Sequence, residues 1–292
     1  MQVAEVVEPY VRGRVRQGEI VALTARNHRV VLGQFGASVR CETEQLSDRH
    51  VRRWLEDYDY LAASTRRNRL ATVRTFCRWL HEEGHCPRNA CKRVKPLREP
   101  KRIPRALTPE QVSAVLDACP DTRARLATVL MVQLGLRRGE VTRLEVGDFD
   151  MNNRLVVVLG KGGHQRVLHV PDQAHSELIR HLAAQGTVAG PLLRSQQFPQ
   201  RGLHPDTVSG IVRRAMEDAG VKQAPRDGVS PHALRHSALT DMLRSGAHIL
   251  DVQAVAGHSS VSVTQKYLPL MVGTLRECME GRTYGAPGTA LA

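Results

Sequence analysis

The sequence lacks the features that place a protein in a membrane or outside the cell. Among its 292 residues, no apolar run approaches the roughly 20 residues that a membrane-spanning helix needs. Residues 1–10 carry Glu5 and Glu8 and show no basic segment followed by an apolar one, which is the pattern of a secretory signal. We therefore expect a cytoplasmic protein that has no membrane among its partners.

Paired cysteines and cofactor motifs are also missing. The six cysteines are scattered without a CxxC pair, which predicts reduced and packed side chains rather than a disulfide framework. There is neither a P-loop for a nucleotide nor a cluster of carboxylates for a catalytic metal. His232 and His236 stand four apart and could share a metal ion, but no acidic residue or cysteine surrounds them at zinc-like spacing. We expect no metal site and no cofactor.

Acidic residues and lysine are both scarce beside arginine. The chain has 42 basic and 29 acidic residues, a net charge of +13, and only six of the basic residues are lysine. A GC-rich gene would explain the ratio of arginine to lysine, but it would not explain the net charge. Residues 1–100 carry a net charge of +7 and residues 101–292 carry +6. Because the excess is spread over both halves, the charge predicts a polyanionic partner such as nucleic acid for the whole chain.

Residues 1–95 have the pattern of a helical domain. Apolar residues recur at helical spacing over 26–37, 47–58 and 64–83, and Ser47 is a good N-cap for the second of these helices. The third helix also carries a row of arginines, which is either a solvated basic face or a DNA-facing one. Those residues are Arg66, Arg67, Arg69, Arg74 and Arg78.

Residues 96–107 read as a linker between two domains. The segment PLREPKRIPRAL contains three prolines, which remove backbone donors and resist helix formation. Its four basic side chains, Lys101 and Arg102 among them, suggest that it follows a phosphate backbone.

Residues 108–281 predict a second, mostly helical domain with a small antiparallel sheet. Thr108, Pro109 and Gln111 form a capping box that opens a helix to about residue 118. Residues 154–160 and 166–170 predict a β-hairpin around a Gly-rich turn. Further helices are expected over 122–134, 172–184, 205–219, 231–245, 249–256, 260–268 and 272–280, before a flexible tail at 282–292. The predicted fold class is therefore α+β, mostly α.

The second domain also contains a series of groups that suit a phosphate. An arginine ends an apolar helix with a glutamate three residues on, a lysine sits on the hairpin turn, and a His-x-x-Arg pair shares one helix face. Each group alone is a weak signal, because a single arginine is usually a surface charge and a single tyrosine usually packs. In chain order they are Arg137, Glu140, Lys161, His232, Arg235, His258 and Tyr267.

Together these groups resemble the tyrosine recombinase, or phage integrase, family over nearly the whole chain. The matching segments are LGLRRGEVTRLEVGDFD, LGKGGHQRVLHVP, SPHALRHSALTDML and AGHSSVSVTQKYL, in that order. The resemblance implies a helical core-binding domain followed by an integrase-like catalytic domain. It also implies a site-specific recombinase that cleaves and rejoins DNA in phage or mobile-element integration and excision, or in Xer-type resolution.

The resemblance also assigns roles. Tyr267 would attack the scissile phosphate and form a 3′-phosphotyrosyl link, and Arg137 and Arg235 would clamp the phosphate. Lys161 would protonate the leaving 5′-oxygen. His232 would assist proton movement at the tyrosine, His258 would hydrogen-bond the phosphate and Glu140 would position Arg137. Rival assignments involve Arg138 beside Arg137, His236 one turn past His232, His164 and Arg166 as phosphate contacts, and Lys266 in place of Lys161.

The type of recombinase follows from length. About 95 residues before the linker suffice for one core-binding domain, which resembles a compact Xer, Cre or short phage integrase without an arm-binding domain. The resemblance implies a homodimer on each double-stranded core site, a homotetramer in the synapse and association with the nucleoid. It leaves open accessory directionality factors, and whether residues 272–280 dock on a neighbouring subunit or on their own domain. The alternatives are a non-cutting DNA-binding regulator of the same fold and a type IB-like topoisomerase.

Overall fold

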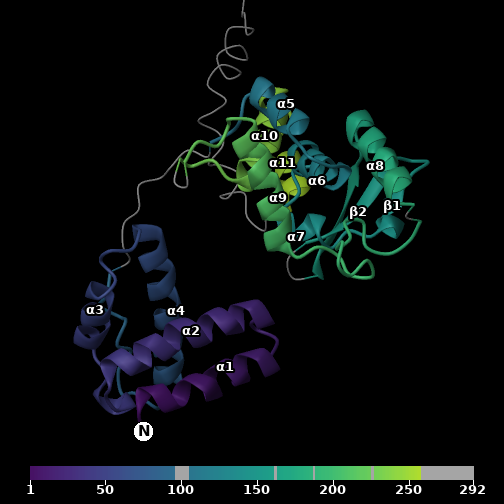
Figure 1. Ribbon diagram of the computed structural model, residues 1–292. Coiled ribbons are helices and arrows are strands. Elements are labelled where there is room, and N and C mark those ends of the chain that lie inside the picture. Colours follow the sequence, from purple (N-terminus) through teal and green to yellow (C-terminus); the bar gives the residue numbers. More distant parts are fainter. Residues whose placement is uncertain (96–104, 161–162, 187, 225–226, 258–292) are drawn as a thin grey trace, which may run out of the picture. The chain divides into compact units, whose positions relative to one another are not determined.

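Two compact units, Met1–Lys101 and Arg102–Ala292, make up the chain (Figure 1). The computed structural model describes residues 1–95, 105–160, 163–186, 188–224 and 227–257. Helices dominate both units, and the second also contains a three-stranded antiparallel sheet. The predicted α+β fold class is therefore confirmed.

The first unit is built from helices around an aromatic core. The rings of Tyr10 and Phe76 meet edge to face at 5.1 Å, and those of Phe35 and Trp54 at 5.2 Å. All four side chains are almost fully buried, and rings of this size each bury a large apolar area. Its elements are 3₁₀ helix Val3–Val6, α1 Val7–Arg16, α2 Ala22–Val39, 3₁₀ helix Thr43–Gln45, α3 Asp48–Glu56 and α4 Ala63–Glu82.

The predicted helices of the first unit are present. Ser47 is the N-cap of α3, as predicted, and α3 buries Val51, Trp54 and Leu55 on one face. α4 begins at Ala63, one residue before the predicted start at residue 64, and Ala62 is its N-cap.

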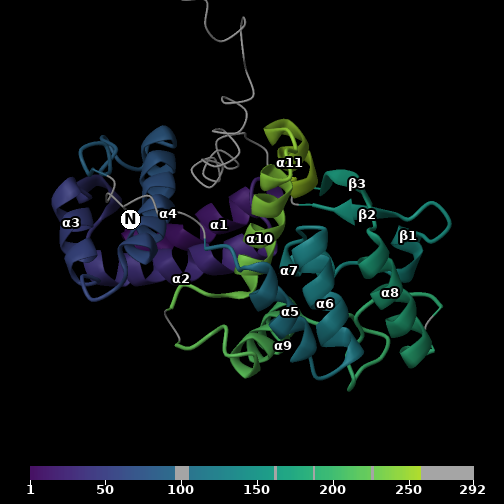
Figure 2. The same cartoon turned by 90° about the horizontal axis from the view of Figure 1, so that it is seen from above.

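The second unit is arranged around one central helix. Its elements are α5 Pro109–Asp117, α6 Thr122–Gln133, α7 Arg138–Val141, 3₁₀ helix Val146–Asp148, β1 Phe149–Asp150, β2 Leu155–Leu159, β3 Gln165–His169, α8 Asp172–Gln185, α9 Pro205–Asp218, α10 Pro231–Arg244 and α11 Ile249–Ala256. α6 packs against α8 on one side and against α9 and α10 on the other (Figure 2). Its apolar residues face every direction, as expected for a helix that neighbours cover on all sides.

The sheet has the order β1-β2-β3 and positions one end of the site. β2 and β3 form the predicted hairpin, with Val157 opposite Val167 and Val158 opposite Arg166. β1 was not predicted, since a two-residue strand is too short to show an alternating pattern. β3 also contacts α11, so the hairpin and that helix lie side by side.

The predicted capping box opens α5, and Ser230 and Gly257 define the ends of two other helices. Thr108 accepts a hydrogen bond from the backbone N–H of Gln111 at 3.3 Å, and the side chain of Gln111 accepts one from the backbone N–H of Thr108 at 3.1 Å. α10 begins after Ser230, and α11 ends at Gly257 in the left-handed conformation. The predicted helices over 260–268 and 272–280 lie outside the described residues. None of the helices that the structure describes is both long and apolar enough to span a bilayer.

Candidate active site

The junction between α6 and α7 places Arg137 and Glu140. α6 ends at Gln133, and Gly135 reverses the chain with φ +64°, a conformation that favours glycine. A side chain at Gly135 would also contact Leu239 of α10 at 3.4 Å. Arg137 is the N-cap of α7, so its side chain leaves a backbone that two helices hold in place.

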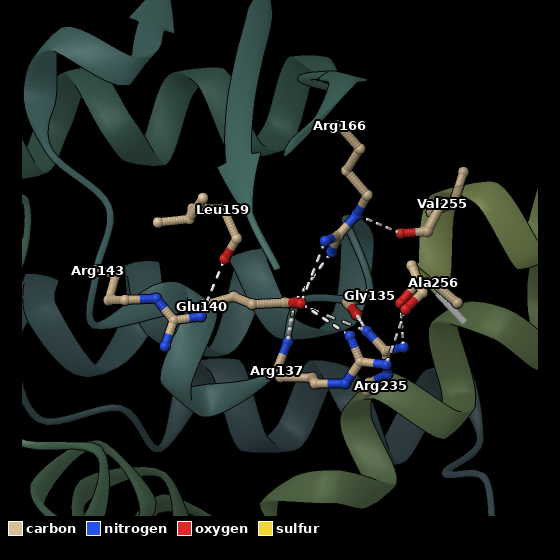
Figure 3. Close-up of polar contacts among 10 residues, drawn as sticks. Gly135, Arg137, Glu140, Arg143, Leu159, Arg166, Arg235, Val255 and Ala256 are labelled. Atoms are coloured by element: carbon tan, nitrogen blue, oxygen red, sulfur yellow. Dashed lines mark hydrogen bonds and ion pairs between the residues drawn. The ribbon is translucent and has the colours of Figure 1, made fainter. Parts of the chain in front are cut away.

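The carboxylate of Glu140 is the centre of the site. Glu140 is 2% exposed, and Figure 3 shows three guanidinium groups directed at its carboxylate. The backbone N–H and Nη1 of Arg137 each donate to it at 2.8 Å. Arg166 donates from Nη1 at 3.1 Å and from Nη2 at 2.9 Å, and Nη1 of Arg235 lies 3.9 Å from Oε2. One buried acid therefore aligns three arginines from three elements.

The four side chains carry more positive than negative charge. Three guanidinium groups share one carboxylate, so the cluster has a net charge of +2 when Glu140 is ionised. Burial raises the pKa of Glu140, but the hydrogen bonds from Arg166 and Arg137 outweigh burial and leave the pKa below its usual value. The acid is thus ionised at neutral pH, and the excess charge suits a bound anion such as a phosphate.

Replacing this acid should weaken the fold in a pH-dependent way. Glu140→Gln is expected to lower the unfolding free energy at pH 7 by about 3 kcal/mol, because removing one partner leaves buried cations without a counter-charge. The pKa of Glu140 is depressed by folding, so its contribution is present above the unfolded pKa of roughly 4.3 and is lost as pH falls through the folded value. Denaturant unfolding of both proteins between pH 7 and pH 3 measures the difference.

An exposed ion pair provides the control for that comparison. Glu217 bonds Arg213 one helical turn away at 2.7 Å, and both side chains are exposed. Glu217→Gln should cost less than about 1 kcal/mol at every pH. A Glu140→Gln cost that is equally small, or that does not change as the solution is acidified, would contradict the ionised buried acid.

Arg235 ties α10 to the ends of two other helices. Its side chain is 2% exposed. It donates a hydrogen bond from Nη1 to the carbonyl of Gly135 after α6, and one from Nη2 to the carbonyl of Ala256 at 2.6 Å. His232 lies one turn earlier on the same helix and is exposed, and its ring meets that of His236 edge to face at 5.3 Å.

The C-terminal end of α11 completes the cluster. The carbonyls of Val255, Ala256 and Gly257 accept hydrogen bonds from Arg166 at 2.8 Å, Arg235 at 2.6 Å and Arg137 at 3.4 Å. Three consecutive carbonyls thus bind three different arginines, as favoured at the negative end of a helix dipole. His258 is the next residue of the chain.

The structure brings together three of the predicted site residues, Arg137, Glu140 and Arg235, and His232 shares a helix with the last of them. Lys161, His258 and Tyr267 lie outside the described residues. Their described neighbours are informative, however. A Cβ built on Gly160 would lie 3.6 Å from Nη1 of Arg166, and one built on Gly257 would lie 3.0 Å from it. The chain positions next to Lys161 and His258 therefore lie at the cluster.

The rival residues are placed differently. Arg138 pairs with Asp206 at 3.0 Å on α9, which directs it away from Glu140. His164 is exposed on the hairpin, and Lys266 lies outside the described residues. Arg166 was predicted only as a rival phosphate contact, whereas its side chain binds Glu140 and the end of α11. A usable signal existed, since Arg166 shares a face of β3 with buried Leu168.

The arginines of α4 have several kinds of surroundings. Arg69 lies over the ring of Tyr58 at 3.9 Å, and Arg74 donates to the carbonyl of Val94. Arg66 is paired with Asp59. Arg67 and Arg78 are exposed, and Lys101 and Arg102 lie outside the described residues. Contact of this face with DNA stays a prediction.

Sequence comparison identifies the family. Residues 105–271 match the model of the phage integrase family, and residues 8–84 match its N-terminal SAM-like domain. Tyrosine recombinase XerC of Myxococcus xanthus is 35% identical over 220 residues, which cover 70% of this chain and 71% of that protein. Tyrosine recombinase XerD of Mycobacterium leprae is 32% identical over 239 residues, which cover 76% of this chain and 74% of that protein. The chain belongs to the phage integrase family of tyrosine recombinases, as its motifs predicted.

Solved structures share the fold. A lambda integrase dimer bound to a COC′ core site has a TM-score of 0.75 at 17% identity. The alignment covers 99% of this chain and 81% of the integrase chain. The XerH site-specific recombinase, bound to a palindromic difH substrate after cleavage, has a TM-score of 0.73 at 18% identity. That alignment covers 95% of this chain and 84% of the XerH chain. The predicted pairing of a helical N-terminal domain with an integrase-like domain is confirmed.

Proposed function

We propose that this protein is a site-specific DNA recombinase that cleaves and rejoins DNA through a covalent 3′-phosphotyrosyl intermediate. The observation that carries the proposal is the cluster of Arg137, Arg166 and Arg235 around one buried acid, with its net charge of +2. A pentacovalent phosphate concentrates negative charge on its non-bridging oxygens, and preorganised guanidinium groups stabilise that charge. Phage or mobile-element integration, or Xer-type resolution, is the biological role that we propose.

The reaction divides into two reversible transfers. The oxygen of Tyr267 attacks the scissile phosphorus, the bond from phosphorus to the 5′-oxygen breaks, and Lys161 protonates that oxygen. Arg137 and Arg235 bind the non-bridging oxygens, His258 donates a hydrogen bond to one of them, and His232 receives the tyrosine proton. A 5′-hydroxyl of the partner strand then displaces the tyrosine. Because the phosphotyrosyl bond conserves the energy of the phosphodiester, the exchange needs neither a metal nor a nucleotide cofactor.

The expected partner is a double-stranded DNA core site. The related lambda integrase is a dimer on such a site, and the XerH structure also contains DNA. We propose a homodimer on each core site of this protein and a homotetramer in the synapse, with accessory directionality factors as further partners. The whole chain has a net charge of +13, and its basic residues in both units would follow the phosphate backbone in the cytoplasmic nucleoid.

A cleavage assay on selected DNA tests the proposal. A core site would first be selected from random duplexes by binding to the full chain, and a nick would then be placed beside each candidate scissile phosphate. The wild-type protein in EDTA should form a protein–DNA adduct that resists boiling in detergent. Two such sites on one plasmid should recombine. Binding without an adduct would favour the non-cutting regulator, and relaxation of the plasmid without recombination would favour a type IB-like topoisomerase.

A further inference from the structure

Arg166 of β3 connects three separate segments of the catalytic unit. Its side chain is 13% exposed, and three of its nitrogens are directed at protein acceptors. Nη1 and Nη2 bind the two oxygens of Glu140 at 3.1 and 2.9 Å, and Nε donates to the carbonyl of Val255 at 2.8 Å (Figure 3). One planar guanidinium therefore fixes the positions of β3, α7 and α11 relative to one another.

Each of the three segments leads into the proposed reaction. The hairpin that contains Arg166 also carries Lys161, five residues earlier. α7 carries Glu140, which holds Arg137 at 2.8 Å. α11 ends two residues before His258. A rotation of any one segment would move a proposed catalytic group relative to the other two.

The end of α11 is shaped around this arginine. Gly257 has φ +58°, and a Cβ there would approach Nη1 of Arg166 to 3.0 Å and its Cζ to 3.3 Å. Glycine therefore satisfies two demands at this position, a left-handed backbone and close approach of a charged side chain. The contact is a packed one, not a loose surface ion pair.

Arg166 also neutralises part of the negative charge of Glu140, which would otherwise act on Arg137 and Arg235. A carboxylate that lost its two-point contact with Arg166 would be left to Arg137 at 2.8 Å and Arg235 at 3.9 Å. Its full negative charge would then oppose the binding of a phosphate by those two groups. With Arg166 in place, the cluster retains its net charge of +2.

We propose that Arg166 is a positioning residue for strand cleavage: it holds Glu140 and the end of α11 so that Arg137 and Arg235 meet on one phosphate. This inference rests on the proposed function. Arg166 itself does not touch the DNA in this proposal, which separates it from the rival interpretation of a phosphate contact.

A second arginine in the same unit provides a matched control. Arg125, near the other end of α6, binds the buried Glu177 at 2.7 Å and donates to the carbonyl of Leu116 at the end of α5. It thus makes the same kinds of bonds, to a buried acid and to a helix end. α6 continues for about eight residues, or roughly 12 Å, beyond Arg125 before the turn at Gly135. Arg125→Met should lower stability as Arg166→Met does, but it should not slow cleavage.

The experiment compares single-turnover adduct formation on the nicked core site at saturating protein, below the melting temperature of every variant. Arg166→Met is expected to react about 100-fold more slowly than wild type, the cost of misplacing reacting groups by about 1 Å. Its affinity for the core site should stay within about threefold of wild type, as should the rate and affinity of Arg125→Met. Arg166→Lys should fall in between, since an ammonium cannot make the two-point contact.

The pH profile separates positioning from general weakening of the fold. Without Arg166 the pKa of Glu140 should rise, so the acidic limb of the cleavage rate should move to higher pH in Arg166→Met. That shift should vanish when Glu140→Gln is added, and Arg166→Met should slow the Glu140→Gln protein by much less than 100-fold. A direct phosphate contact would instead appear as weaker DNA binding with an unchanged pH profile.

Four outcomes would overturn the inference. They are cleavage by Arg166→Met at the wild-type rate, slowing that Arg125→Met reproduces, full additivity of Arg166→Met with Glu140→Gln, and weaker DNA binding by Arg166→Met with an unchanged pH profile. Absence of an adduct with the wild-type protein would instead overturn the proposed function, and this inference with it.

Discussion

A Tyr267→Phe variant is expected to form no covalent adduct with nicked core-site DNA, under conditions in which the wild-type protein converts most of the substrate. Phenylalanine keeps the aromatic ring but lacks the phenol oxygen that we propose as the nucleophile. Unlike a general acid or a positioning group, a missing nucleophile cannot be replaced by neighbouring groups or by a higher pH. This loss should therefore be complete rather than partial.

The measurement is a denaturing gel of end-labelled DNA after incubation with each protein. Tyr284→Phe is the matched control, because Tyr267 and Tyr284 are the two tyrosines of residues 102–292. The control should form adduct at the wild-type rate. Both variants should bind the core site within about threefold of wild type, as removal of a single hydroxyl is a small change.

The opposite pattern would be decisive. An adduct with Tyr267→Phe and none with Tyr284→Phe would move the nucleophile to the later tyrosine. An adduct with both would require a nucleophile of another kind, and digestion of the adduct to a labelled peptide would identify it. In either case the order of the motifs would no longer describe the chemistry of this chain.

Elements with local signals were predictable from the sequence. The capping box of Thr108 and Gln111 marked the start of α5, and the helix predicted over 249–256 has the bounds of α11. The β2–β3 hairpin followed from one β-branched and one alternating segment around a Gly-rich turn. These features depend on residues a few positions apart, so a single sequence contains all the information that they need.

The centre of the site was only partly predictable. The sequence placed Glu140 within reach of Arg137, because the two are three residues apart in a helical turn. It did not reveal that Arg166, 26 residues later, binds the same acid. That contact depends on how the hairpin packs against α7 and α11. Only the alternation in β3 offered a hint, because a charged residue that faces inward beside Leu168 requires a buried partner.

Arg235→Lys is expected to slow adduct formation by about 1,000-fold or more, the usual loss when a phosphate-clamping arginine is removed from a phosphoryl transfer. Lysine keeps the positive charge and much of the length. Arg235 donates to the carbonyls of Gly135 and Ala256 from two different nitrogens of its guanidinium. A single ammonium nitrogen cannot make both of these bonds and bind a phosphate as well. The charge should remain while the geometry is lost.

Arg235→Ala should lose cleavage too, but it is the less informative variant. It removes one of the largest fully buried side chains and leaves two buried carbonyls without a donor, at about 1–3 kcal/mol each. The resulting loss of stability could itself weaken DNA binding. The lysine variant, measured beside a melting curve, separates the two effects.

Arg244 at the opposite end of α10 provides the comparison for Arg235. It is about half exposed, its Nη1 lies 3.8 Å from Asp241, and Arg244→Lys should leave cleavage and binding unchanged. Core-site affinity of Arg235→Lys should stay within about tenfold of wild type, since one of many phosphate contacts is altered. If Arg235→Lys instead cleaved normally and bound the site far more weakly, Arg235 would be a binding residue. The net charge of the cluster would then serve to hold DNA and not to stabilise the transition state.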